Sequence, residues 1–247
     1  IRRTVELLRD HPALLAWYMC DEPEGCDHNP DWYKAAYRLI NELDPYHPCI
    51  VLNYGTRGMR TYYEPCDVLM PDCYPDYQIN AQAKKPVVDT ADYMKTAREL
   101  GRVPWIVPQG FDWSFYGGTR YATSRGPTLD EMRCQAWLSV VHGARGILWF
   151  IYGHTQSSYH FRWGREFVER ELHALFPALL APELPDAVQS SNKKVHCALR
   201  KVDDKLYLFA VNADPGPQQA TLTLADMPAE GWVVVSENRR LAGQNGK

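Results

Sequence analysis

Two adjacent carboxyl residues follow a short apolar run near the start of the sequence. Residues 14–20 read LLAWYMC, and Asp21, Glu22 and Pro23 come directly after them. The run has the length of a buried strand, and Pro23 cannot continue a central ladder. The two acids therefore end a predicted strand, where α/β folds place ligands and catalytic groups. Because acids at such an edge are costly unless they are paired or do chemistry, we predict a functional site here.

Glu22 and Asp72 form the predicted catalytic pair. Glycoside hydrolysis needs one protonated carboxyl and one carboxylate across the scissile bond. Glu22 is the candidate general acid, because the charge of Asp21 beside it would favour its protonated form in a low-dielectric mouth. Asp72 ends another apolar run, and two strands of separation would leave about 7–10 Å between the carboxyls, as in an inverting pair. The alternatives are an arginine ion pair for Asp21 and Glu22, and a turn hydrogen bond for Asp72.

Aromatic and amide side chains at predicted strand ends are the candidate substrate contacts. Rings at the mouth of a sheet suit flat, partly apolar ligands such as sugars, although each ring could equally belong to the core. The segment 117–127 lacks periodicity and could form a loop over this mouth. His154 could also line it. The predicted substrate-binding residues are Asp21, Tyr54, Tyr74, Gln109, Trp113, Trp149 and Tyr152.

The elements that must position these residues alternate between strand and helix patterns. Thr128 and Glu131 have the spacing of a capping box at the start of a helix. Alternation of this kind implies parallel strands joined by crossover helices. Predicted strands cover residues 14–21, 49–54, 67–72, 103–111 and 147–152, and predicted helices cover 2–10, 29–44, 90–100, 128–142 and 165–180.

The pattern changes after Pro182 and Pro185. Short alternating runs follow without a helical period, and Asp203-Asp204 is placed as a hairpin turn between two of them. We therefore predict two domains, over residues 1–185 and 186–247. The expected fold class is α/β, with a partial TIM-like (β/α) barrel followed by a small antiparallel domain that resembles a β-sandwich.

The composition of the chain argues against several classes of binding partner. The chain has 247 residues and a formal net charge of −3, which gives no electrostatic reason to expect nucleic acid. No apolar stretch approaches the roughly 18 residues of a membrane helix, so we expect no membrane partner either. Cys20, Cys26 and His28 match no standard zinc spacing, and we expect neither a metal nor a cofactor. The start at Ile1 indicates an incomplete N-terminus and leaves the compartment open between the cytoplasm and secretion from a bacterium.

Several motifs, in this order, resemble the barrel glycoside hydrolases. The segment 11–24 is similar to the fourth strand of their retaining clan, which ends in Asn-Glu-Pro with the Glu as acid/base; Asp21 stands where the Asn would be. Later segments resemble the following strands in order. Residues 44–48 resemble the lead into strand five, residues 72–75 the end of strand six, residues 107–111 the end of strand seven, and residues 143–150 strand eight. The resemblance covers residues 8–182 and implies strands four to eight only, followed by a β accessory domain.

One position departs from this resemblance. The clan carries its nucleophilic Glu at the end of strand seven, where this sequence has Gln109, which cannot attack an anomeric carbon. The leading hypothesis is hydrolysis of β-linked glycosides or oligosaccharides by carboxylate general acid/base catalysis. The alternatives are a carbohydrate-binding pseudo-enzyme without the nucleophile, and a metal-dependent hydrolase using Asp21, Glu22, His28 and Asp72.

An open parallel sheet raises a question of exposure. We expect Trp17, Met19, Leu69, Ile106 and Leu148 to be partly exposed if the barrel is incomplete, and exposed parallel edges aggregate unless they are covered. We therefore expect a homo-oligomer in which two half-barrels cover each other's open faces. The alternative is a fragment whose other half is missing.

Overall fold

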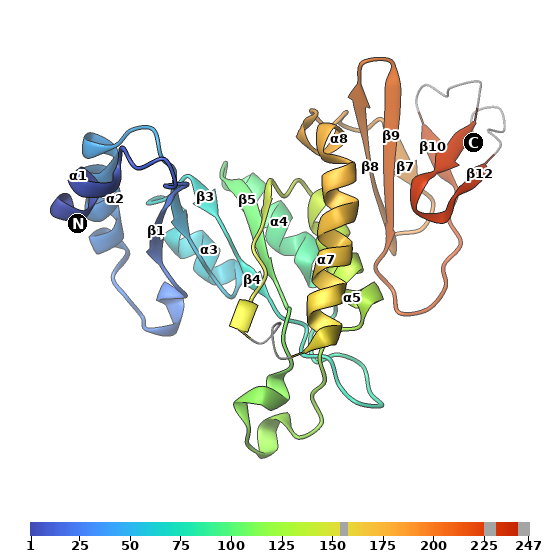
Figure 1. Ribbon diagram of the computed structural model, residues 1–247, viewed down its shortest axis with the longest axis horizontal. Helices are drawn as coiled ribbons and strands as arrows, with labels where there is room; N and C mark the ends of the chain where they lie inside the picture. Colours follow the sequence, from blue (N-terminus) through green and yellow to red (C-terminus); the bar gives the residue numbers. More distant parts are fainter. Residues whose placement is uncertain (154–157, 225–230, 242–247) are drawn as a thin grey trace. The chain divides into compact units, whose positions relative to one another are not determined.

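The computed structural model describes residues 1–153, 158–224 and 231–241 (Figure 1). The chain divides into two compact units, residues 1–169 and 170–247. The first is a mixed α/β unit around a parallel sheet, and the second is built mainly from antiparallel strand pairs. The predicted domain boundary between residues 185 and 186 stays a prediction.

The parallel sheet of the first unit runs in the order β1 (Trp17–Cys20), β2 (Cys49–Val51), β3 (Val68–Leu69) and β5 (Val103–Pro108). Val68 pairs with Val103 and Asp72 with Val107, so β4 (Asp72–Cys73) continues the line of β3 along β5. The other side of β5 pairs with β6 (Gly146–Ile147). All these pairings are parallel, which confirms the α/β class expected from the alternating sequence pattern.

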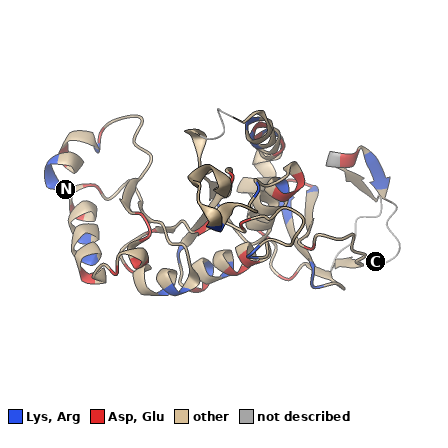
Figure 2. Cartoon of the chain, turned by 90° about the horizontal axis from the view of Figure 1, so that it is seen from below, with Lys and Arg blue, Asp and Glu red and all other residues tan. Residues whose placement is uncertain are grey.

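Helices connect the strands, and side chains cap several of them. The Asn29 side chain accepts a hydrogen bond from Asp31 N, and Thr128 and Glu131 form the predicted capping box. Acidic and basic residues are interspersed along the chain (Figure 2). No helix among the described residues is long and apolar enough to span a membrane. The helices are α1 (Arg2–Leu8), α2 (Pro30–Leu43), α3 (Thr56–Tyr62), α4 (Asp89–Glu99), α5 (Leu129–Val141), α7 (Tyr159–Ala174) and α8 (Phe176–Leu180), with 3-10 turns η1 (Pro23–Gly25), η2 (Trp113–Tyr116) and η3 (Thr119–Tyr121).

The sheet has a different core on each face. On the face covered by α3 and α4 (Figure 1), Leu69 and Ile106 are fully buried, so the expectation that these two would be partly exposed is wrong. Trp17 and Met19 are half-buried, and Leu148 is 55% exposed, as expected. The opposite face buries a second cluster, made of Ile50, Leu52, Val68, Met70 and Val107 with Tyr74, Trp105 and Phe150 packed against it.

The second unit contains three antiparallel strand pairs among its described residues. Asp203 turns between the two longest strands with a positive φ of 51°, as the predicted hairpin requires. The pairs are β8 (Val195–Val202) with β9 (Lys205–Asn212), β7 (Val188–Ser190) with β10 (Leu222–Leu224), and β11 (Trp232–Val234) with β12 (Arg239–Leu241), and the 3-10 turn η4 (Val235–Glu237) joins the last two strands.

Candidate carboxyl site

Glu22 lies two residues beyond the end of β1 in a left-handed backbone conformation. Its φ is 45° and its ψ is 55°. Its N–H donates to the Leu52 carbonyl at 3.1 Å, which extends the pairing of β1 with β2. The left-handed region costs a non-glycine residue about 1–2 kcal/mol, so neighbouring contacts must hold Glu22 in place.

Asp72 is the first residue of β4 and is only 4% exposed. Its N–H donates to the Asn53 carbonyl at 3.1 Å. The carboxyl of Asp72 lies within hydrogen-bonding reach of the Glu22 carboxyl. Burial, followed by this hydrogen bond and the charge of Glu22, raises the pKa of Asp72 far above its ordinary value. Burial and the neighbouring Glu22 therefore favour the protonated form of Asp72, whose Oδ1 is buried without a hydrogen-bond partner in the described structure.

The expected separation of about 7–10 Å between these carboxyls is therefore wrong. Asn53, two residues beyond β2, donates its amide to Glu24 Oε2 at 2.6 Å. Contact between two carboxyls fits neither separation found in two-carboxylate glycosidases, roughly 5–5.5 Å or 6.5–9.5 Å.

Tyr18 joins this site and is absent from the residues predicted from the sequence. Its hydroxyl donates to Asp21 Oδ1 at 2.9 Å, and Tyr18 is 51% exposed. Burial, followed by the hydrogen bond to Asp21, raises the pKa of Tyr18, and the charge of Asp72 adds to this. Tyr18 pairs with Ile50 and alternates with Trp17 along the strand, which is the signal that could have placed it on the carboxyl face.

An aromatic wall stands beside the carboxyl pair. Burial, followed by the charges of Asp72 and Glu22, raises the pKa of Tyr74. The Tyr74 ring stacks on Phe150 with 5.9 Å between centroids and meets Trp113 at 6.1 Å. The structure therefore brings five predicted site residues to one place, and these are Asp21, Glu22, Asp72, Tyr74 and Trp113.

Gln109 is fully buried and uses its amide inside the protein. Its Oε1 accepts from Asp76 N at 3.2 Å, and its Nε2 donates to the Phe111 carbonyl at 3.0 Å. Its own N–H donates to Gln135 Oε1 at 3.2 Å. Gln109 thus connects the end of β5 to the segment after β4, through Asp76, and to α5, through Gln135.

The remaining predicted contacts lie elsewhere on the first unit. Tyr54 is exposed, and its N–H donates to Glu24 Oε1 at 2.8 Å. Trp149 is half-buried, close to Gly110. Tyr152 is exposed, with the Arg165 guanidinium 5.7 Å from its ring centre. No described contact joins Tyr54 or Trp149 to the carboxyl pair. His154 lies outside the described residues.

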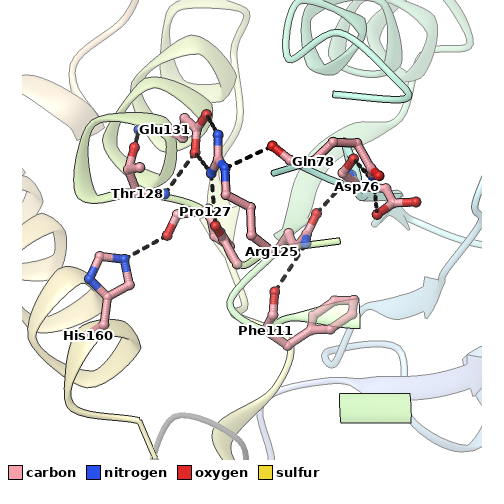
Figure 3. A network of polar contacts seen from close by, with 10 residues as sticks. Asp76, Gln78, Phe111, Arg125, Pro127, Thr128, Glu131 and His160 are labelled. Carbon is pink, nitrogen blue, oxygen red and sulfur yellow. Dashed lines mark hydrogen bonds and ion pairs between the residues drawn. The ribbon is translucent and has the colours of Figure 1, made fainter. Parts of the chain in front are cut away.

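A polar network fastens the segment that follows β5 (Figure 3). The Asp76 carboxylate accepts hydrogen bonds from Gln78 Nε2 and Ser124 Oγ, both at 2.8 Å. Arg125 donates both ends of its guanidinium to Glu131 at 2.7 and 2.8 Å. The loop predicted over residues 117–127 is therefore tied at its far end to α5 and to the segment after β4.

The described acidic, histidine and cysteine side chains do not form a metal-binding cluster. Within the part of the chain that the structure describes, no group of three or more His, Cys, Asp or Glu residues is placed to hold a metal ion. His28, the ligand in the metal-dependent alternative, has its Nδ1 2.6 Å from the Tyr33 hydroxyl. That hydroxyl also accepts from Cys20 Sγ, so these polar groups hydrogen-bond to one another.

Comparison with known proteins gives structural likenesses only. No family model and no curated protein matches the chain. A β-galactosidase from Halorubrum lacusprofundi is 15% identical with a TM-score of 0.43, and the match covers 60% of this chain and 34% of the other chain. A putative α-L-fucosidase from Bacteroides thetaiotaomicron is 11% identical with a TM-score of 0.48, and the match covers 68% of this chain and 61% of the other. A β-galactosidase from Marinomonas ef1 is 13% identical with a TM-score of 0.47, and the match covers 62% of this chain and 29% of the other.

The chain thus spans between 29% and 61% of the length of these three proteins. At such identities and scores the likenesses say nothing about what this chain acts on.

Proposed function

We propose that this chain is part of a (β/α) barrel glycoside hydrolase, in which Glu22 protonates the departing oxygen of a β-linked glycoside. The observation that supports this most is the place of Glu22, a partly exposed carboxyl just beyond the carboxyl end of the parallel strand β1 and close to the aromatic ring of Tyr74. The parallel order from β1 to β6 with intervening helices is compatible with strands four to eight of such a barrel.

In this proposal the two carboxyls have unequal roles. Glu22 is partly exposed and can reach a bound sugar, whereas Asp72 is buried and can reach it only through Glu22. In the reacting state each carboxyl carries a proton: Glu22 gives its own to the leaving oxygen, and Asp72 keeps its own and donates it as a hydrogen bond to the Glu22 carboxylate that is left. Asp72 is a positioning residue here, and the opposing carboxylate that hydrolysis needs must come from another side chain.

The substrate contacts follow from the neighbouring groups. Tyr74 and Trp113 present aromatic rings on which a sugar can stack, and Trp113 Nε1 is buried without a hydrogen-bond partner in the described structure. Asp21 and the Tyr18 hydroxyl can bind sugar hydroxyl groups, since both are exposed at the same edge. No metal or cofactor takes part in the proposed reaction.

Turnover of aryl glycosides tests this function. We expect the wild-type chain to hydrolyse phenyl or nitrophenyl β-glycosides, and Glu22→Gln to lower kcat/KM on a phenyl glycoside by about 10²- to 10⁴-fold, the usual contribution of a general acid. Glu64→Gln, which changes an exposed carboxylate paired with Lys34, is the matched control and should leave turnover unchanged. Equal turnover by wild type and Glu22→Gln would contradict the proposal.

A carbohydrate-binding protein without catalysis is the second candidate. It is favoured by Gln109, whose amide is used internally, and by the Glu22–Asp72 contact, which leaves no carboxylate at a catalytic distance within that pair. Calorimetric titration with oligosaccharides separates the two candidates. Binding that Trp113→Ala weakens, with no hydrolysis by wild type, would favour the binding protein.

A further inference from the structure

We propose that Glu24 is the positioning residue that fixes the Glu22 segment on β2 and so keeps the Glu22 carboxyl against Asp72; this inference rests on the proposed function. Glu24 lies in η1, two residues after Glu22. Its Oε1 accepts from Tyr54 N at 2.8 Å, and its Oε2 accepts from Asn53 Nδ2 at 2.6 Å. One carboxylate thereby binds both the backbone and a side chain just beyond β2.

The same stretch, just after β2, also holds Asp72. Asn53 is fully buried, and its carbonyl accepts from Asp72 N at 3.1 Å. The preceding carbonyl, that of Leu52, accepts from Glu22 N at 3.1 Å. Both members of the carboxyl pair are therefore placed from two consecutive residues, and Glu24 is the side chain that fastens the Glu22 segment to them.

Gly58 in α3 leaves the space that the Glu24 carboxylate occupies. A Cβ at this position would lie 2.2 Å from Glu24 Oε1 and 2.8 Å from Oε2. Glycine within a helix costs about 1 kcal/mol relative to alanine. The backbone of α3 has no positive φ at Gly58, so the close approach of Glu24 is the feature that calls for glycine here.

The anchoring counteracts the strained backbone at Glu22. Glu22 has a left-handed φ of 45°. Among the described contacts, its carbonyl accepts one hydrogen bond, from Gly25 N at 2.9 Å, which closes the local turn. Strained residues persist where the surrounding structure over-determines them. Without the Glu24 anchor, Glu22 can relax and its carboxyl can leave Asp72.

Four variants of the full chain test this role by steady-state kinetics on a phenyl glycoside. Glu24→Ala should lower kcat by about 10- to 100-fold with little change in KM, because a small misplacement of an acid lowers the rate of the chemical step. Glu24→Gln should stay near wild type, since Asn53 can turn its unpartnered Oδ1 toward the new amide. Gly58→Ala should resemble Glu24→Ala, and the double variant Glu24→Ala/Gly58→Ala should be no worse than either.

Glu99→Ala is the control. Glu99 lies in α4 and makes an exposed ion pair with Arg60, which lies in α3 as Gly58 does. It should leave kcat unchanged. The inference is overturned if folded Glu24→Ala keeps the wild-type kcat, or if Gly58→Ala and Glu24→Ala lower kcat additively.

A wild-type chain without turnover would defeat the proposed function and leave this inference to be decided by a titration. The groups that face Asp72 are Glu22, Asp21, Tyr18 and Tyr74. Carbon-13 NMR of the Asp72 carboxyl should then show a lower pKa in Glu24→Ala than in wild type, because Glu22 has moved away. An unchanged pKa of Asp72 would overturn the inference.

Discussion

The neighbouring carboxyls of Glu22 and Asp72 are the central feature at the scale of residues. Sequence reasoning selected both, because each follows an apolar run at a strand end. It could not give their interaction, which depends on how close the ends of β1 and β4 lie in the fold. Tyr18 was missed because its partner Asp21 is three residues away, beyond an irregularity in the pairing of β1 with β2.

The raised pKa of Asp72 predicts how stability depends on pH. The folded state keeps a proton on Asp72 that the unfolded state releases above about pH 4. The free energy of unfolding should therefore fall as pH rises from about 4 toward the raised pKa. Asp72→Asn should remove this part of the fall and be at least about 1 kcal/mol more stable than wild type at pH 8.

Urea unfolding of both proteins between pH 4 and 8 measures this difference. Asp67→Asn is a comparison at a partly buried carboxylate that accepts from Tyr37 and Cys49 N. Parallel stability curves for wild type and Asp72→Asn would show that the folded protein does not hold this proton.

At the scale of elements, capping signals predicted the starts of α2 and α5, whereas the helix predicted over residues 165–180 is wrong at its start and in its continuity: α7 begins at Tyr159, and α8 follows it from Phe176. Thr128 and Glu131 have the spacing of a capping box and form one in the structure. The short helix α3 went unpredicted, because Gly58 weakens its helical pattern and serves the packing of Glu24 instead. The alternation of strands and helices gave the parallel sheet, but it could not show that Leu69 and Ile106 face α3 and α4.

The cap of α5 should contribute measurably to stability. The Thr128 hydroxyl accepts from Glu131 N at 3.2 Å, and Glu131 returns a bond to Thr128 N at 2.8 Å. Thr128→Ala should lower the free energy of unfolding by about 1 kcal/mol. Thr61→Ala, at an exposed helical threonine, should cost little or nothing, and thermal or urea unfolding compares the two. Equal effects would show that the capping box contributes nothing.

At the scale of the whole molecule, the sheet has two unpaired edges among the described residues. β1 pairs only with β2, and β6 only with β5. Leu15 is 69% exposed near one edge, and Leu148 is 55% exposed near the other. We propose that two copies of this chain associate and cover these edges, as the sequence led us to expect.

Size-exclusion chromatography with light scattering tests this association. We expect about twice the chain mass of 28.4 kDa at micromolar concentration, and a shift toward monomer in Leu148→Lys. Leu7→Lys, at an exposed leucine of α1, is the control. A wild-type mass of one chain at that concentration would contradict the proposal.

Leaving-group dependence tests the proton-donating role of Glu22 most directly. A phenyl glycoside needs a proton on its departing oxygen, whereas a 2,4-dinitrophenyl glycoside releases a stable anion and needs none. The account predicts that Glu22→Gln loses at least about 10²-fold in kcat/KM on the phenyl substrate and retains nearly wild-type turnover on the dinitrophenyl one. Equal losses on both substrates would contradict it.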